Sequence, residues 1–456
     1  MKATVARPNH ELATYIVLTS LFLVLQLAGL ARGLDSNGLV SHFSSQSLTY
    51  EFSFSQLRHL GPEITLVWLL GVAVFILLFH RYPKPFRVIV QVADRLLANP
   101  WVAIVVSLAC ARVFYALSNE FINPDGRLFQ AAFSSASGRP DSVLTHDEIW
   151  EFFLHWKLWY WGSQHLGWTA AETYHIASSL AGAGFIFVLI ALSHLLVPAH
   201  PTALFLAVTS AGFMQLFFGD VENYTLTALL ILCYLFTAIL HIKGRVSLVV
   251  PSAILAVAVT FHLLAATLLP SLIYLAFRSV SNFGRRSIYA PLAAFLAITL
   301  ATLVGFHYGG LPISNLFFHT HAFGHGGAIL ANFAFPSLSP YLQHANLLLL
   351  LSPSVIILLP LVVFRRFPSH PTNILLVIAA ASLVAFQLTW RSGIGVYNDW
   401  NLYAASAIPI SVLMWANFLT NVRMRWRAEV FVALVALTGM QSLIWIVWNH
   451  YYPYGY

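Results

Sequence analysis

Long runs of consecutive apolar residues dominate the chain. Two of the clearest are ITLVWLLGVAVFILLF at 64–79 and NLLLLLSPSVIILLPLVVF at 346–364. Each is close to the roughly 20 residues that an α-helix needs to cross a bilayer. Strands of a membrane barrel would instead alternate apolar and polar residues over about ten positions. The pattern therefore predicts an all-α polytopic membrane protein.

Thirteen apolar segments are predicted to be transmembrane helices. They cover residues 12–31, 64–80, 101–118, 177–197, 202–218, 224–242, 248–261, 264–278, 288–306, 343–364, 371–389, 401–420 and 430–448. The seventh and eighth are short, and basic residues both precede 248–261 and follow 264–278. A single crossing would put one basic cluster on the wrong side of the membrane. We therefore expect two short helices that meet near His262.

The composition agrees with a membrane protein. Hydrophobic residues make up 59% of the chain and charged residues 9%, whereas a soluble domain is roughly 25% charged. This excludes an ordinary soluble enzyme, a disordered chain and a nucleic-acid module with a basic face. Cys110 and Cys233 lie inside apolar runs, so no structural disulfide is expected.

The charges predict the orientation of the helices. With the N-terminus in the cytoplasm, 16 of the 23 lysines and arginines fall on the inner side, as the positive-inside rule favours. The C-terminus and 13 of the 16 acidic residues then lie on the outer side. We expect a multi-pass protein of the plasma (inner) membrane whose functional face is extracytoplasmic. The net charge of +7 needs no nucleic-acid partner.

No linker divides the chain. We expect residues 1–100 to form an additional N-terminal two-helix segment, with 12–31 as a retained span. Residues 101–456 would form the main transmembrane domain, and 119–176 its first large outer loop.

This outer loop contains an Asn-Pro-Asp-Gly turn with Asp125, followed by a stretch that holds five of the 13 tryptophans. A tryptophan-rich helix with a polar face is typical of the membrane interface. On such a helix Glu148, Glu151 and His155 share one face. The structural alternatives are a turn former for Asp125 and a helix N-cap for Glu148.

A second polar group is FFGDVENYTL at 217–226, which places Asp220 and Glu222 in a very short loop between apolar segments. Both could simply cap the next helix. Carboxylates near membrane depth are costly, however, and are usually functional. His262 could face a cavity at the break between its two short helices, or could hydrogen-bond to a carbonyl group.

Two later segments add further candidates. NLFFHTHAFGHGG at 315–327 contains His319, His321 and His325, whose spacing fits no zinc signature and favours a phosphate or sugar contact. The second segment, WRSGIGVYNDWNLY at 390–403, contains Arg391, which could contact an anion. Asp399 either contributes to the site or caps the segment 401–420. On the predicted topology these groups gather at one outer end of the bundle.

Taken in order, these motifs resemble the GT-C superfamily of membrane glycosyltransferases over roughly residues 101–420. The features concerned are the Pro-Asp-Gly turn, the acidic GDVENY loop, the break at FHLLAATLLP, SPYLQHANLLLLLSP and the NDWNLY loop. The likeness is to the group of protein mannosyltransferases and lipid A aminoarabinose transferases. The first loop has no clear Asp-X-Asp pair, which leaves the metal ligands open.

The resemblance implies a polyprenyl-phosphate sugar donor and transfer with inversion to a glycan, lipid or protein acceptor. Asp125 is the first choice of general base, and Asp220 and Glu222 would orient the acceptor or hold Mg or Mn with it. Residues expected to bind substrate are Glu148, His155, Lys157, His262, His319, His321, Arg391 and Asp399. Membrane lipids would surround the bundle. The alternatives are a secondary transporter, although no internal repeat is evident, and a non-catalytic membrane subunit.

Overall fold

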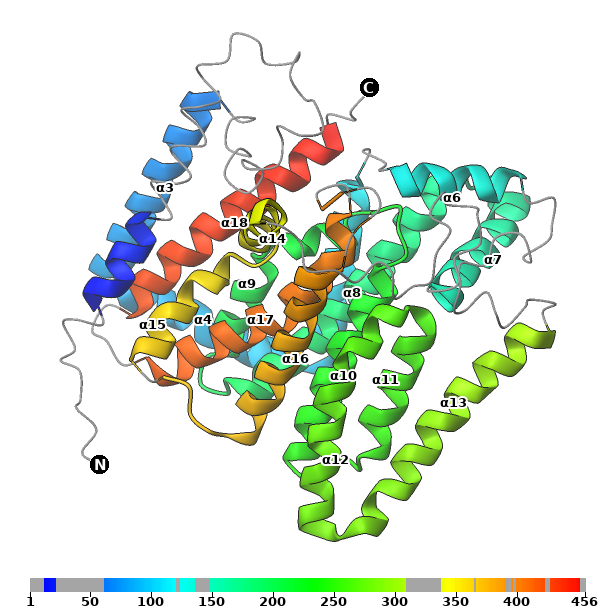
Figure 1. Cartoon of the computed structure of the whole chain (residues 1–456). Helices are drawn as coiled ribbons and strands as arrows, with labels where there is room; N and C mark the ends of the chain where they lie inside the picture. Colours follow the sequence, from blue (N-terminus) through cyan, green and yellow to red (C-terminus); the bar gives the residue numbers. More distant parts are fainter. Residues whose placement is uncertain are drawn as a thin grey trace.

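The computed structural model describes residues 12–21, 61–119, 124–135, 148–308, 338–364, 366–390, 392, 395–396, 399–422 and 427–451. The elements in these ranges are helices (Figure 1), which confirms the predicted all-α class. In chain order they are a helix over Leu12–Leu21, α3 (Gly61–Arg81), α4 (Pro83–Leu97), α5 (Pro100–Ala116), α6 (Pro124–Ser135), α7 (Ile149–Leu166), α8 (Ala170–Leu196), α9 (Pro201–Thr209), η4 (Gly212–Phe217), α10 (Thr225–Ile242), α11 (Val249–Phe261), η5 (Leu263–Leu268), α12 (Leu269–Phe283), η6 (Arg285–Ile288), α13 (Tyr289–Tyr308), α14 (Leu338–Leu351), η10 (Pro353–Ile357), α15 (Leu358–Val363), α16 (Pro371–Thr389), α17 (Trp400–Asn421) and α18 (Arg427–Tyr451).

Several of these helices match membrane spans. Within the described residues, seven helices are long and apolar enough to cross a bilayer, or nine if each of two bent pairs counts as one span. Shorter apolar helices cover 12–21, 100–116 and 249–261. The multi-pass architecture is confirmed, but the predicted number of thirteen is not.

Prolines account for both bent pairs. The axes of α3 and α4 differ by 96°, and those of the two halves of segment 343–363 differ by 101°. Tyr82 and Ser352 stand at the breaks, each followed by a proline and each with a non-helical backbone. Because proline clashes with a helical conformation of the preceding residue, the chain turns at both positions.

The predicted span 202–218 is also interrupted. It forms α9, which ends at Thr209, and then the 3₁₀ helix η4. Gly212 at the start of η4 packs so closely on α14 that an added Cβ would lie 2.2 Å from the carbonyl oxygen of Leu350. This close approach requires glycine and brings the two segments together in the core.

Helix α17 is the centre of the bundle. Every residue in its most apolar 18-residue stretch is buried, and its neighbours include α9, α10 and α16. The outer helix α13 exposes a stripe of leucines at four-residue spacing, Leu292, Leu296 and Leu300. Such an apolar surface suits contact with lipid tails. Cys110 and Cys233 are free thiols, as expected.

Helices α6 and α7 lie at one end of the bundle, beside the start of α8 (Figure 1). Aromatic rings join them: Phe133 of α6 is stacked on Tyr174 of α8 at 5.8 Å and lies 5.2 Å from Phe152 of α7. This aromatic cluster fixes α7 against the bundle and so determines where the polar face of α7 points.

Candidate active site

The polar face of α7 is buried, as the spacing predicts. The exposed fractions of Glu148, Glu151 and His155 are 7%, 0% and 0%. Glu148 occupies the N-cap position of α7, but its side chain makes no capping hydrogen bond. The capping alternative for this residue is therefore wrong, and its carboxylate faces the neighbouring segments instead.

Glu151 caps a different helix. Its Oε1 accepts from the backbone N–H of Leu226 at 2.7 Å, and its Oε2 accepts from the N–H and the hydroxyl of Thr227 at 3.1 and 2.6 Å. These are the second and third residues of α10, whose N-terminus needs acceptors. Burial raises the pKa of Glu151 to about 7, even though the hydrogen bonds from Thr227 and Leu226 act in the opposite direction.

Asp220 and Glu222 lie in the turn between η4 and α10, with exposed fractions of 3% and 2%. Neither occupies the N-cap position of α10, which is Tyr224. The turn depends on Gly219, which has a φ of +72° and lies so close to Ser118 that a Cβ would meet its hydroxyl oxygen at 2.8 Å. The alternative that either acid is the N-cap residue of α10 is thus wrong, and a favourable interaction with the helix dipole stays a prediction.

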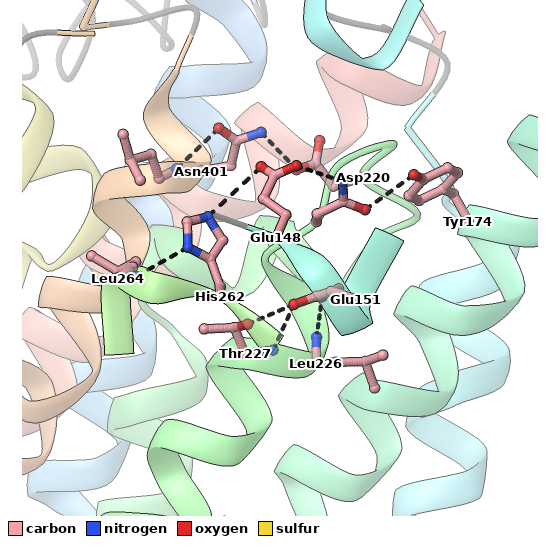
Figure 2. Close-up of polar contacts among 11 residues, drawn as sticks. Glu148, Glu151, Tyr174, Asp220, Leu226, Thr227, His262, Leu264 and Asn401 are labelled. Atoms are coloured by element: carbon pink, nitrogen blue, oxygen red, sulfur yellow. Dashed lines mark hydrogen bonds and ion pairs between the residues drawn. The ribbon is translucent and has the colours of Figure 1, made fainter. Parts of the chain in front are cut away.

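Asp220 is held by groups from two helices. Its Oδ2 accepts from Nδ2 of Asn401 on α17 at 3.1 Å (Figure 2), and its carbonyl oxygen accepts from the hydroxyl of Ser178 on α8 at 3.1 Å. Burial raises the pKa of Asp220 to about 7, against the lowering effect of hydrogen bonds from Asn401 and Asn119. This carboxyl group can therefore exchange a proton near neutral pH.

Glu148 connects three elements. Its Oε2 accepts from Nδ2 of Asn223 at 2.9 Å, and Oδ1 of Asn223 accepts from the Tyr174 hydroxyl at 3.0 Å. Its Oε1 lies 3.7 Å from Nε2 of His262. In the view of Figure 2, Glu148 lies between His262 and Asp220.

His262 stands at the predicted break, between α11 and η5. Its Nδ1 accepts from the backbone N–H of Leu264 at 3.1 Å. This nitrogen therefore does not donate to a carbonyl group, which was the structural alternative for His262. A neutral ring with an accepting Nδ1 carries its proton on Nε2. That proton faces Glu148, and the ring lies 5.0 Å from Tyr224.

The other described candidates lie around this cluster. His155 is stacked on Tyr174 at 4.2 Å, and burial lowers its pKa to about 4, so it is a neutral group and not a cation for phosphate. Lys157 lies on the exposed face of α7, with Nζ 4.4 Å from the ring centre of Trp156. Asp399 is buried at the N-cap position of α17, where its side chain makes no capping bond.

Several candidates fall outside the described side chains. The backbone of Asp125 is the second residue of α6, but its side chain is not described. His319, His321 and Arg391 lie outside the described residues, and so does His325. Their proposed contacts with phosphate or sugar stay predictions.

The described residues contain no group of three His, Cys, Asp or Glu side chains that could hold a metal ion. A site for Mg or Mn formed by Asp125, Asp220 and Glu222 stays a prediction.

The sequence reasoning missed three polar partners and one capping role in this cluster. They are Tyr174, Asn223 and Asn401, and the capping role of Glu151. Asn223 and Asn401 stand inside the GDVENY and NDWNLY motifs, so amides next to acids were an available signal. Tyr174 and the role of Glu151 depend on contacts between distant segments, which no local pattern contains.

No protein-family model and no curated protein matches this chain. Among solved structures, it is similar to two crystal structures of ArnT from Cupriavidus metallidurans, one bound to undecaprenyl phosphate and one in the apo state. Each has 16% identity and a TM-score of 0.47; the matches cover 69% and 70% of this chain and 60% of ArnT. At this similarity neither its activity nor its ligand is carried over, and function is argued from the residues described above.

Proposed function

We propose that this protein is an integral-membrane glycosyltransferase that moves a sugar from a polyprenyl-phosphate donor to an acceptor hydroxyl on the extracytoplasmic face. The observation that carries the proposal is the buried cluster of Asp220, Glu222 and Glu148 at one end of a lipid-embedded bundle. Buried carboxylates are expensive unless hydrogen-bonded. The chain has only 16 acidic residues and buries several of them together, which favours a role for them in chemistry.

Asp220 has the properties of a general base. Its pKa, raised to about 7, allows it both to be ionised at neutral pH and to accept a proton in the transition state. The acceptor hydroxyl transfers its proton to Asp220 while its oxygen attacks the anomeric carbon. The bond from that carbon to the phosphate oxygen breaks, and polyprenyl phosphate leaves with the electron pair. One in-line displacement inverts the anomeric centre.

The neighbouring groups receive positioning roles in this proposal. Glu148 and His262, 3.7 Å apart, can bind sugar hydroxyls as acceptor and donor. Glu222 would orient the acceptor, and Asp125 is the alternative base. Arg391, His319 and His321 are proposed to stabilise the leaving phosphate, because developing negative charge needs donors or cations.

The charge distribution supports an extracytoplasmic site. The carboxylate cluster lies at the start of α8 and α10, whereas Lys243 and Arg245 follow the end of α10. Helix α8 has 27 residues and is therefore about 40 Å long at 1.5 Å per residue. The basic end would be cytoplasmic by the positive-inside rule, which puts the acidic end outside.

Envelope glycans and glycolipids provide the test. Cells that lack this protein are complemented with the wild-type chain, with Asp220→Asn or with the control Glu429→Gln, a carboxylate near the basic end. We expect the mass-spectrometric glycan profile of Asp220→Asn cells to match that of the deletion, while Glu429→Gln restores the wild-type profile. Restoration by a fully expressed Asp220→Asn protein would refute a catalytic role for this residue. A deletion that changes solute uptake but no glycan would favour the transporter.

A further inference from the structure

A cavity of about 550 Å³ lies at the opposite end of the bundle from the carboxylates. Eleven of its 14 lining residues are apolar and come chiefly from the start of α5, the second half of α8 and the end of α10, while His194, Lys243 and Arg245 add a substantial polar surface. Representative lining residues are Ala103, Phe187, Ile190, Phe236 and Leu240. Its volume falls within the range of about 300–1,000 Å³ that is typical of ligand sites.

Two cations stand in the wall of this apolar cavity, Lys243 and Arg245. Nζ of Lys243 donates to the carbonyl oxygen of Leu195 at 2.9 Å, which ties the end of α10 to the end of α8. The backbone N–H of Arg245 donates to the carbonyl oxygen of Leu240 at 2.9 Å, so the chain turns back over the end of its own helix. Both side chains remain exposed, and an apolar hollow with cations in its wall matches an amphiphile that carries an anion.

Helix α4 adjoins the cavity, which Leu97 helps to line at its C-terminal end. The helix has no buried residue and is bent by 96° from α3. The helical spacing places Lys84, Arg87 and Arg95 on one face of α4. Exposed apolar residues such as Ile89 and Leu96 lie on the opposite face. A basic amphipathic helix at a right angle to a span is suited to lie in the headgroup layer.

We propose that this cavity binds one anionic phospholipid from the surrounding leaflet, with its phosphate at Lys243 and Arg245 and part of an acyl chain along the apolar wall. Basic pockets between transmembrane helices are known to select anionic headgroups on the cytoplasmic side. With α4 in the headgroup layer, the adjoining cavity would lie at the depth of lipid phosphates. The site is independent of the transfer reaction, because it lies at the other end of α8 and α10.

Lipid retention by the purified full-length protein tests this proposal. Native mass spectrometry would count molecules of phosphatidylglycerol, phosphatidylcholine and inorganic phosphate bound after detergent exchange. The double variant Lys243→Gln/Arg245→Gln is compared with Arg285→Gln/Arg286→Gln, which removes the same charge from η6 outside the cavity. Each lysine or arginine near a lipid surface contributes about fivefold to binding, so we expect the cavity variant to bind phosphatidylglycerol about 25-fold more weakly. The η6 variant should bind as the wild type does.

A second variant separates the cavity from surface charge. Ala191→Trp keeps every cation but fills the apolar wall, and it should also release phosphatidylglycerol; size-exclusion profiles and thermal midpoints of both cavity variants verify folding. Equal loss in the cavity and η6 variants would reduce the effect to general electrostatics and overturn the proposal. Retention of inorganic phosphate alone, or equal retention of phosphatidylcholine, would also overturn it.

Discussion

The two ends of helices α8 and α10 differ in the sign and the burial of their charged side chains. At the starts of these helices, Glu148, Glu151 and Asp220 are buried and each is held by specific donors. At their ends, Lys243 and Arg245 are exposed beside an open cavity. Exposed basic groups cost little and orient the protein in the membrane. Buried acids require partners from several helices, and the proposed chemistry depends on this arrangement.

The largest effect should come from the acidic end through Asp220. Replacement by asparagine removes the proton acceptor, and general-base catalysis contributes about 10²- to 10⁴-fold to rate. We expect transfer by Asp220→Asn to fall by that factor while the thermal unfolding midpoint changes little. Initial rates and melting curves on the same preparation provide the measurement. A loss of less than fivefold would remove Asp220 from the mechanism.

Glu151 should matter for stability more than for chemistry. Glu151→Ala leaves two N–H groups and a hydroxyl at the start of α10 without their acceptor, at a cost of about 1–3 kcal/mol for each buried group that finds no other partner. We expect a large drop in the thermal midpoint in detergent, and a smaller one for Glu151→Gln. The matched control is Glu172→Gln, which alters the cap of α8 at an exposed position. Equal drops for Glu151→Ala and Glu172→Gln would contradict the capping role.

Gly219 tests whether the acidic turn needs its left-handed backbone. The positive φ destabilises an alanine at this position by about 1–2 kcal/mol. Its Cβ would also lie 2.8 Å from the hydroxyl oxygen of Ser118. Gly219→Ala should therefore lower both the thermal midpoint and the transfer rate. Gly395→Ala, which has a positive φ but open space around it, isolates the backbone contribution. Comparable losses in both variants would mean that contact with Ser118 is unimportant.

The dependence on pH should run in opposite directions for activity and stability. Asp220 must be ionised to act, so kcat/KM should fall about tenfold for each pH unit below its pKa of about 7. Raised carboxyl pKa values mean that the folded state binds protons which the unfolded state has lost. The stabilisation from Asp220 and Glu151 is thus complete below about pH 4 and disappears as pH rises towards 7. Activity and melting profiles that rise together would contradict this assignment.

The smallest effect is expected at the basic end. Arg285→Gln/Arg286→Gln removes two charges of η6, far along the chain from the carboxylate cluster. Transfer should stay within twofold of wild type, because these residues touch neither the cluster nor the cavity wall. A loss of transfer as large as that of Asp220→Asn would show that the two ends are not separate.

Local sequence patterns predicted the helices well. The segments 224–242 and 371–389 correspond to α10 and α16, and the break at His262 is where charge placement put it. The shared face of Glu148, Glu151 and His155 also followed from helical spacing. These features depend on periodicity and charge within one segment, which the sequence contains directly.

Long-range partnerships could not be read in the same way. The cap that Glu151 places on α10 joins residues 75 positions apart, and Asn401 reaches Asp220 across 181. An N-cap role for Asp220 or Glu222 was a reasonable local alternative, but Tyr224 is the N-cap residue, and Glu151 of α7 accepts from N–H groups in the first turn of α10. The bends after Tyr82 and Ser352 had a local signal in the prolines that follow, and periodicity alone overlooked it.

Release of polyprenyl phosphate is the most direct measurement of the central claim. The full-length protein in lipid nanodiscs would be given a panel of synthetic polyprenyl-phosphate hexoses and pentoses with an envelope extract as acceptor. The account predicts that at least one donor yields free polyprenyl phosphate and a glycosylated product with wild type, and that Asp220→Asn yields about 10²- to 10⁴-fold less. No release from any donor by the folded wild-type protein, or equal release by Asp220→Asn, would contradict it.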